Sequence, residues 1–376
     1  MIYLDHAAST PVRREVLEAM WPYLVGEYGN PSSHHEVGES AARALAAARA
    51  SLAAQLGARP AELIVTSGGT ESDNLAIKGI VLASQRGRHI ITSAIEHEAV
   101  LESCDYLVRL HGASLTVLPV DSDGLVAAPD LAAAIRADTA LVSIQHANNE
   151  VGVVQPIAAL AQIAKDAGIP FHTDAVQSTG WLPVTLADLG ADAITIAGHK
   201  LGAPKGIGLL VLRAGIPLEP LLHGGGQERG RRSGTENVAA LVGLAKALEL
   251  APRGHDSSVR DALIDGVLAA VPGALLTGSR EHRLANHASF AFPGTSGEAV
   301  LLELERHGIT CSSGSACAAG SDEPSHVLTA MGLVAEVAQT AVRFTLSETT
   351  TLEEVAVVVA RVAEAVEAVG GLSTRR

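Results

Sequence analysis

Short apolar runs alternate with stretches of helical periodicity between residues 62 and 212. Six of the runs are rich in Ile, Val, Leu and Thr, a composition typical of strands. They lie at residues 63–66, 89–92, 115–118, 141–144, 169–172 and 193–196. Helical patterns separate most of them, at residues 71–84, 99–110, 129–137 and 157–167. Because parallel strands are joined by crossover helices, this order predicts an α/β fold with a mostly parallel sheet covered on both faces.

A seventh strand is predicted at residues 206–213, where Gly206 and Gly208 precede an apolar run. Their Gly-x-Gly spacing matches part of a dinucleotide-binding fingerprint. That fingerprint requires a helix directly after the glycines, whereas residues 209–212 read Leu-Leu-Val-Leu. We therefore interpret the segment as a strand and reject a dinucleotide site.

The length of 376 residues exceeds what a single hydrophobic core usually organises. A polar segment at residues 252–256 follows a predicted helix at 237–250 and marks a boundary. Beyond it, short strands at 288–292 and 341–346 are interspersed with helices, the last at 352–369. We predict a large α/β domain at residues 14–252 and a smaller α+β domain formed by residues 1–13 and 253–376.

Composition and charge restrict the classes of function. A hydrophobic share of 47% with only 3% aromatic residues favours an α/β enzyme whose core packs small aliphatic side chains. The net charge of −14 repels phosphate backbones, so direct binding to nucleic acid is not expected. Cys104, Cys311 and Cys317 lack CxxC spacing, which predicts a reducing, cytoplasmic location and no structural zinc site. The sequence contains no run of roughly 20 apolar residues, so it predicts no membrane span.

The segment Gly198-His199-Lys200 follows the strand predicted at 193–196. Open α/β proteins bind ligands at this carboxyl edge of the sheet. Partial desolvation or neighbouring cations lower the pKa of a lysine there, and the neutral amine can then form a Schiff base or act as a base. A solvated surface lysine is the alternative interpretation of this segment alone.

The loop at residues 67–74, Ser-Gly-Gly-Thr-Glu-Ser-Asp-Asn, lies between a predicted strand and a predicted helix. Its glycines allow a close approach to a ligand, the helix N-terminus offers N–H groups to an anion, and Thr70 adds a hydroxyl. An ordinary capped turn is the alternative. The loop is not a Walker loop, because no Lys-Ser/Thr pair follows it.

Asp174 follows another predicted strand, and an aspartate there can hold a heterocyclic nitrogen protonated. His172 and Asp174 also have the spacing of two metal ligands, but no third ligand of fitting spacing accompanies them. Asn149 follows the strand at 141–144 and His97 the strand at 89–92, so both belong to the same edge.

Residues 311–321 consist almost entirely of Cys, Ser, Gly and Ala. Such a run cannot anchor a core, so we expect a mobile loop that carries Cys317 between a buried substrate and a surface partner. A small buried cysteine is the alternative interpretation, and it is the one we expect for Cys104, which lies in a helical pattern.

Together these motifs resemble the fold type I pyridoxal-phosphate enzymes of aminotransferase class V. Lys200, the Gly-Gly-Thr loop and residues 174–177 carry this resemblance. The run Ser-Ser-Gly-Ser-Ala-Cys at 312–317 narrows it to the NifS/IscS-type cysteine desulfurases. Further matches extend along the chain, at residues 3–8, 29–33, 223–229, 232–235 and 342–344.

The resemblance implies a pyridoxal 5'-phosphate cofactor bound covalently to Lys200, with Asp174 at its ring nitrogen and His97 stacked on its ring. Asn149 and Gln177 would contact the ring hydroxyl region. The implied contacts with the phosphate come from Gly69, Thr70, His199 and, across a homodimer interface, Thr235. Many relatives carry Ser where this chain has Ala197, so one hydroxyl donor to the phosphate is missing.

The implied activity converts L-cysteine to L-alanine. Arg343 and Asn149 would bind the substrate, Lys200 would move its α-proton, and His97 is a candidate acid or base. The Cys317 thiolate would take the sulfur as a persulfide. An acceptor protein would then receive the sulfur for iron–sulfur cluster assembly, tRNA thiolation or DNA sulfur modification.

Two alternatives stay open at this point. A selenocysteine lyase or another class V enzyme would not need Cys317. A non-catalytic scaffold would use the fold only to bind partners. A serine hydrolase, suggested by His223-Gly224-Gly225-Gly226, is rejected because the sequence contains no Gly-x-Ser-x-Gly motif.

Overall fold

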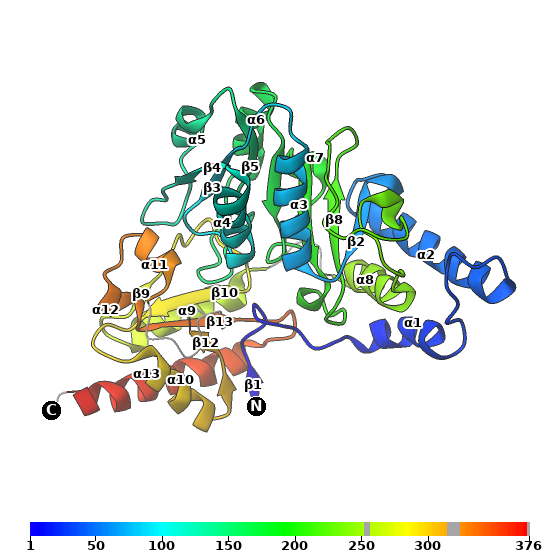
Figure 1. Cartoon of the computed structure of the whole chain (residues 1–376). Helices are drawn as coiled ribbons and strands as arrows, with labels where there is room; N and C mark the ends of the chain where they lie inside the picture. Colours follow the sequence, from blue (N-terminus) through cyan, green and yellow to red (C-terminus); the bar gives the residue numbers. More distant parts are fainter. Residues whose placement is uncertain (252–255, 314–323, 374–376) are drawn as a thin grey trace.

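A seven-stranded sheet forms the centre of the larger part of the molecule (Figure 1). The structure is a computed structural model that describes residues 1–251, 256–313 and 324–373. The strand order is β2-β8-β7-β6-β5-β3-β4. The strands are β2 (Leu63–Thr66), β3 (His89–Ser93), β4 (Ser114–Leu118), β5 (Thr139–Ser143), β6 (Phe171–Asp174), β7 (Ala193–Ala197) and β8 (Gly208–Leu212). The seven predicted strands are thus confirmed, with end points that move by one or two residues.

The sheet is mostly parallel, as predicted. The strands β4, β3, β5, β6 and β7 pair in parallel, whereas β8 runs antiparallel to both of its neighbours, β7 and β2. A Cβ at Gly208, which opens β8, would lie 2.5 Å from the backbone carbonyl carbon of Gly68. The second glycine of the Gly-x-Gly pair therefore allows the backbone that follows β2 to approach β8 closely.

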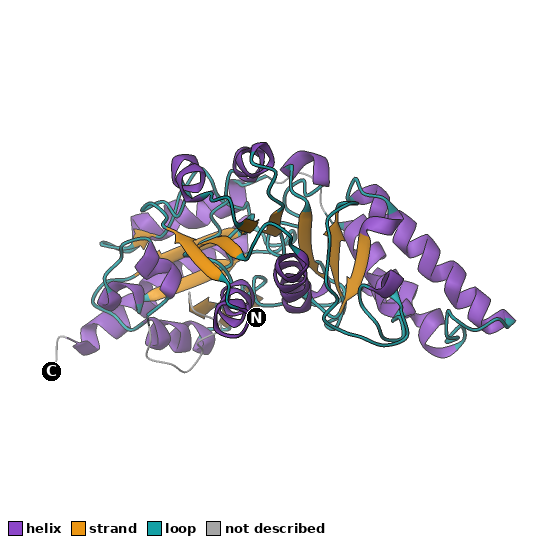
Figure 2. Cartoon of the chain, turned by 45° about the horizontal axis from the view of Figure 1, so that its top comes forward, coloured by secondary structure: helices purple, strands orange, loops and turns teal. Residues whose placement is uncertain are grey.

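Helices cover both faces of this sheet (Figure 2). Because successive side chains of a strand point to opposite faces, Ile64 packs with the cluster of α3 and α4, and its neighbour Val65 with the cluster of α1, α2, α6 and α8. The helices of this part are α1 (Arg14–Val25), α2 (Glu36–Gln55), α3 (Gly69–Ala83), α4 (Glu98–His111), α5 (Ala128–Ala134), α6 (Ile157–Asp166), α7 (Leu186–Leu189) and α8 (Val238–Leu250).

A second, antiparallel sheet lies below the first in Figure 1. Its strand order is β12-β13-β10-β9, and the N-terminal strand β1 (Ile2–Tyr3) pairs with β11 (Ile309–Thr310) beside it. The remaining strands are β9 (Leu275–Leu276), β10 (His287–Ala291), β12 (Ser312–Ser313) and β13 (Ala341–Thr345). The helices are α9 (Ser258–Ala270), α10 (Gly297–Arg306), α11 (His326–Ala330), α12 (Ala335–Ala338) and α13 (Leu352–Ser373).

The second sheet has its own apolar core, in which Leu4 packs with Phe290, Phe344 and residues of α9, α10 and α13. Leu4 therefore joins the N-terminal segment to the C-terminal part of the chain. We keep the division into residues 14–252 and residues 1–13 with 253–376 as a proposal that this packing supports. Within the described ranges, no helix combines the length and the apolar character needed to cross a membrane.

Two predicted boundaries differ from the structure for local reasons. The strand predicted at 169–172 begins only at Phe171, because the Ile169 amide donates to Ala164 O at the end of α6 and Pro170 has no amide hydrogen. The helix predicted at 129–137 ends at Ala134, because Ile135 takes an extended conformation with φ −66° and ψ 130°.

Candidate active site

A cavity of about 350 Å³ lies at the carboxyl edge of the larger sheet. Much of its wall is formed by the segments that follow the carboxyl ends of β2, β5, β6 and β7, and these four strands run in the same direction. The predicted site residues that line it are Gly69, Thr70, His97, Asn149, Asp174, Gln177, His199, Lys200 and Arg343. Residues from six separate stretches of sequence are therefore brought together around one space.

Lys200 lies in the 3-10 turn η2 (Gly198–Lys200), directly after β7. Its Nζ donates to the carbonyl oxygen of Ala8 at 2.9 Å and to that of Ala7. Gln177 Nε2 donates to the same Ala7 oxygen at 3.1 Å. The N-terminal segment thus forms one wall of the cavity and holds the lysine amine beside the loop that follows β6.

Asp174 ends β6 and is almost fully buried. The Val176 amide donates to Asp174 Oδ1 at 2.8 Å. Burial raises the pKa of the Asp174 carboxyl, while the nearby charges of His97 and Lys200 act to lower it. A cationic ligand group beside this carboxylate would compensate the cost of burying its charge.

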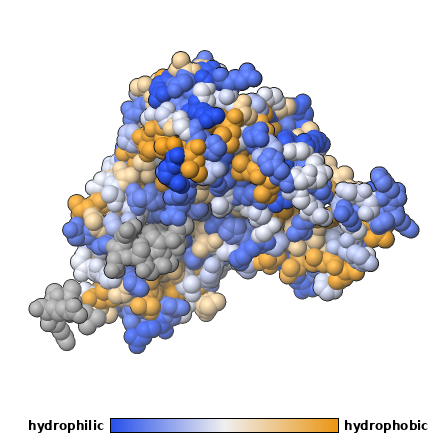
Figure 3. Space-filling model, in the orientation of Figure 1, coloured by the Kyte–Doolittle hydropathy of each residue, from blue (hydrophilic) through white to orange (hydrophobic). Residues whose placement is uncertain are grey.

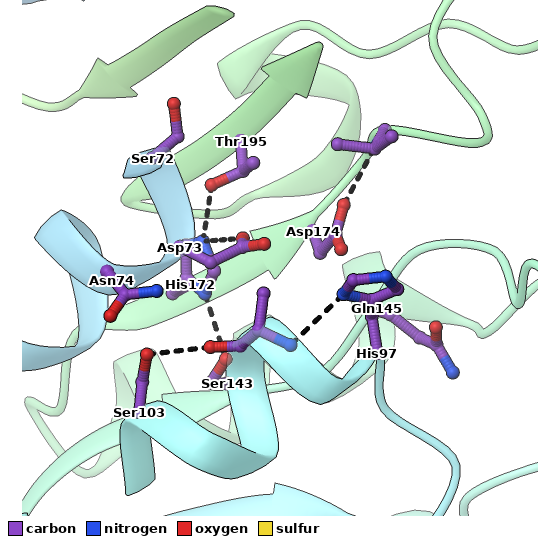
Figure 4. Close-up of polar contacts among 12 residues, drawn as sticks. Ser72, Asp73, Asn74, His97, Ser103, Ser143, Gln145, His172, Asp174 and Thr195 are labelled. Carbon is purple, nitrogen blue, oxygen red and sulfur yellow. Dashed lines mark hydrogen bonds and ion pairs between the residues drawn. The ribbon is translucent and has the colours of Figure 1, made fainter. Parts of the chain in front are cut away.

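A buried polar cluster lies beside Asp174 (Figure 4). The ring of His172 shares hydrogen bonds with Ser143 Oγ at 2.8 Å and Thr195 Oγ1 at 3.0 Å, and its Nε2 lies 3.6 Å from Asp73 Oδ1. Burial lowers the pKa of His172 to about 3, so the ring is neutral at pH 7. Burial, and then the charge of Asp174, raises the pKa of Asp73 well above its ordinary value.

His172 therefore has hydroxyl partners on both ring nitrogens. Within the described ranges, no group of three or more His, Cys, Asp or Glu side chains is arranged to hold a metal ion.

His97 is the N-cap residue of α4. Its Nδ1 accepts a hydrogen bond from the Ala99 amide at 3.1 Å, so a neutral ring carries its proton on Nε2 (Figure 4). The second predicted histidine, His199, contacts Ser9 Oγ at 3.4 Å through Nδ1. Burial and the charges of Lys200 and Lys205 lower the pKa of His199 to about 4, so this ring is also neutral at pH 7.

The first turn of α3 borders the cavity with its N–H groups and with Thr70, whose side chain is exposed. A Cβ at Gly69 would lie 2.9 Å from Val176 Cγ2 and 3.4 Å from Ala197 Cβ. A larger residue would therefore press on the Val176 side chain, which follows β6, and would touch Ala197 at the end of β7. The Ala197 methyl group takes part in that packing and supplies no hydrogen-bond donor.

Arg343 lies on β13, the strand of the second sheet that reaches the cavity, and only 1% of it is exposed. Its Nη1 donates to Asn149 O at 2.8 Å and its Nη2 to Asp5 Oδ1 at 2.7 Å. Its buried Nε has no hydrogen-bond partner among the described residues. The cavity is thus lined by the Arg343 guanidinium as well as by the Lys200 amine and Asp174.

Among the predicted site residues that the structure describes, Thr235 does not line this cavity. Thr235 is exposed. Arg232, three residues earlier, donates from Nε to Glu71 Oε1 at 2.8 Å. The segment of Thr235 is therefore attached to the first turn of α3 while the Thr235 side chain faces outward. Cys317 lies outside the described residues. Cys104 is fully buried on α4, as predicted.

Sequence reasoning missed other residues of the cavity wall: Ala7, Ala8, Asp73, Gln145 and Ala147. Gln145 and Ala147 follow β5 and were detectable by the same rule that identified Asn149. Asp73 belongs to the glycine loop that was singled out, but its burial depends on the packing of α3 onto the sheet. Ala7 and Ala8 lie in the stretch 3–8 that matches the family, but they contact Lys200 through backbone oxygens, which their residue type does not predict.

Comparisons with known proteins agree with the resemblance seen in the motifs. The model of the family described as aminotransferase class-V matches residues 2–358. A cysteine desulfurase IscS of Dictyoglomus turgidum is 48% identical, over 94% of this chain and 91% of that protein. A solved NifS-like protein superposes with a TM-score of 0.89 at 38% identity, covering 96% of this chain and 98% of that one. A structure described as SspA in complex with cysteine gives a TM-score of 0.83 at 39% identity, covering 92% and 99%.

Proposed function

The chain belongs to the aminotransferase class-V family and to its IscS/NifS-type cysteine desulfurases, and from this premise we propose that it is a pyridoxal-phosphate-dependent enzyme that removes sulfur from L-cysteine. One observation carries the proposal most strongly. The Lys200 amine, the buried Asp174 carboxyl and the Arg343 guanidinium line the same cavity. These are the three groups needed to hold an aldehyde, a ring nitrogen and a substrate carboxylate.

The donor set of the cavity fits pyridoxal 5'-phosphate. Asp174 is a buried carboxyl that lacks a cationic hydrogen-bond partner of its own in the contacts described above, and a protonated ring nitrogen would supply one. The first turn of α3, Thr70 and the neutral His199 would bind the phosphate, without help from Ala197. When bound, the cofactor supplies an aldehyde that joins to amines and an electron-withdrawing ring that acidifies the α-carbon of an amino acid.

Each of the side chains around the cavity has a separate proposed role. Arg343 binds the substrate carboxylate through donors that its fixed contacts leave open. The Lys200 amine would serve as the base for the α-proton of the substrate, and in this structure it donates hydrogen bonds to the Ala7 and Ala8 oxygens. Asp174 would keep the ring nitrogen protonated, and His97 and Gln177 would border the ring.

Cys317 is the proposed sulfur acceptor within the chain. Its thiolate attacks the sulfur of L-cysteine, an S–S bond forms as the C–S bond breaks, and the carbon that keeps the electron pair takes up a proton, so that L-alanine leaves and a persulfide remains. The described residues on either side of residues 314–323 support this role. Ser312 pairs with Arg343 across β12 and β13, and Ser325 Oγ donates to Glu150 Oε2 at 2.5 Å.

A homodimer is the proposed assembly. Thr235 faces outward, as a residue that serves a neighbouring subunit must. Hydrophobic surface also gathers over α1 at the lower right of Figure 3, where Leu17, Trp21 and Leu24 are each more than half exposed. A sulfur-acceptor protein is the proposed second partner. The cytoplasmic location stays a prediction from cysteine usage.

Turnover of L-cysteine by the holo-protein tests the function. We expect equal amounts of L-alanine and, with a reducing thiol present, sulfide. Lys200→Ala abolishes both products, whereas Lys205→Ala, five residues further along, retains them. Cys317→Ala retains the visible absorbance of the cofactor but loses sulfide release.

Two outcomes contradict the proposal. A holo-protein that turns over no L-cysteine would reject the desulfurase function. A Cys317→Ala variant with unchanged sulfide release would reject the persulfide step and favour a lyase that does not need this thiol, for which L-selenocysteine is the substrate to compare.

A further inference from the structure

Asp5 forms an ion pair with Arg343 across 338 positions of sequence. The Arg343 Nη2 to Asp5 Oδ1 distance is 2.7 Å, and the side chains are 1% and 17% exposed. Arg343 is proposed above to bind the substrate, whereas no role follows from the motifs for Asp5. An acidic group this close to a substrate-binding arginine either positions it or competes with the substrate for it.

The backbone fixes Asp5 against the strand that carries Arg343. Asp5 forms an isolated parallel bridge with Thr345 of β13. Hydrogen bonds flank Asp5 in the sequence. Before it, Leu4 O accepts from the Thr345 amide at 2.7 Å, and after it, the Ala7 amide donates to Thr345 Oγ1 at 2.8 Å. The Tyr3 hydroxyl lies 3.1 Å from Asp5 O. Asp5 is therefore a rigid anchor for the guanidinium group.

Two fixed acceptors determine how the guanidinium plane lies. Asn149 O accepts from Nη1 and Asp5 Oδ1 accepts from Nη2. With a single hydrogen bond the guanidinium group could still rotate about that hydrogen bond. Two hydrogen bonds from different nitrogens fix the orientation of its plane. Arg343 has five N–H donors, so these contacts leave the Nε donor and one donor on each terminal nitrogen for a ligand.

We propose that Asp5 is a positioning residue, which orients Arg343 so that its remaining donors bind the α-carboxylate of the amino-acid substrate. Bidentate binding of a carboxylate depends on the direction of the donors as well as on charge. The proposal rests on the proposed function, in which Arg343 binds that carboxylate. It assigns to the N-terminal segment a role in substrate selection in addition to its contact with Lys200.

Paired ligands test this role without turnover. L-alanine and ethylamine differ by the carboxylate, and the binding of each to the holo-protein is followed by the absorbance of the cofactor. We expect Asp5→Ala to weaken L-alanine binding roughly tenfold to a hundredfold, the range of a hydrogen bond between charged groups. Ethylamine binding changes less than about twofold. The KM for L-cysteine rises in the same proportion as the L-alanine dissociation constant, and kcat falls less.

Asp5→Asn is the conservative variant, because its amide oxygen still accepts from Arg343. We expect it to restore L-alanine binding to within roughly fivefold of wild type. Glu348→Ala is the matched control. Glu348 also joins the two ends of the chain, through an ion pair with Arg13 at 2.7 Å, but it does not line the cavity.

Three results would overturn the proposal. Unchanged L-alanine binding in Asp5→Ala would remove the positioning role. Equal weakening of L-alanine and ethylamine would indicate a general structural defect. Tighter L-alanine binding in both variants would mean that the charge of Asp5 opposes the substrate. A wild-type holo-protein that binds L-alanine but does not release sulfide from L-cysteine would reject the proposed function and leave the positioning role intact.

Discussion

Glu96 precedes the cavity residue His97 and has none of its surface exposed. Ser93 Oγ donates to Glu96 Oε1 at 2.5 Å, and the Gln145 amide donates to the same oxygen at 3.0 Å. Burial raises the pKa of the Glu96 carboxyl from 4.5 to about 8, and the charge of Asp174 acts in the same direction. We predict that Glu96→Gln, which resembles the protonated side chain, becomes progressively more stable than wild type as the pH rises.

The size of this effect follows from the linkage between proton binding and unfolding. Because the pKa is higher in the folded protein, the proton on Glu96 stabilises the fold fully below pH 4.5, and this stabilisation is lost as the pH rises through about 8. The difference between 8 and 4.5, at about 1.36 kcal/mol per pH unit, gives about 5 kcal/mol. Groups that titrate alike in both proteins cancel in the comparison.

Urea denaturation of both proteins at equal concentration, followed by circular dichroism, measures this difference. We expect the two free energies of unfolding to agree within about 1 kcal/mol near pH 5 and to differ by about 5 kcal/mol near pH 9. Glu150→Gln is a graded comparison, because burial raises the pKa of Glu150 only to about 7, which corresponds to about 3 kcal/mol. A difference for Glu96→Gln that does not change with pH would refute the reasoning.

Three further changes have defined outcomes. Asp174→Asn removes the charge that would hold the ring nitrogen protonated, so sulfide release falls by about a hundredfold or more while the cofactor still binds; wild-type turnover would contradict this. Gly69→Ala adds a methyl group 2.9 Å from Val176 Cγ2 and weakens cofactor binding roughly tenfold in an absorbance titration, and an unchanged dissociation constant would exclude the close approach. Glu228→Ala leaves Arg49, whose side chain is 13% exposed, without its ion-pair partner and costs about 3 kcal/mol in urea denaturation; a loss below about 1 kcal/mol would show that the pair is not stabilising.

Much of the larger sheet could be predicted because all of its strands except the edge strand β4 are buried on both faces. Segments such as β7, predicted at 193–196 and observed at Ala193–Ala197, read as continuous apolar runs that no loop would carry. The direction of β8 was not predicted. The connection of ten residues between β7 and β8 is shorter than the crossover that a parallel pair needs, so its length favours the antiparallel pairing that the structure shows.

The site was predictable where it follows strand ends and unpredictable where it depends on tertiary contacts. Lys200 and Asp174 follow neighbouring parallel strands, so the order of strands alone implies that they share an edge. The contact of Lys200 with the Ala7 and Ala8 oxygens depends on how the N-terminal segment packs against β13. No local pattern in residues 5–8 encodes that packing.

The attachment point of the cofactor is the central claim, and mass spectrometry of the borohydride-reduced holo-protein measures it directly. The account predicts a single phosphopyridoxyl adduct, on the peptide that contains Lys200. An adduct on Lys205, on Lys78 or on the N-terminal amine, or no adduct at all in a protein that turns over L-cysteine, would contradict it.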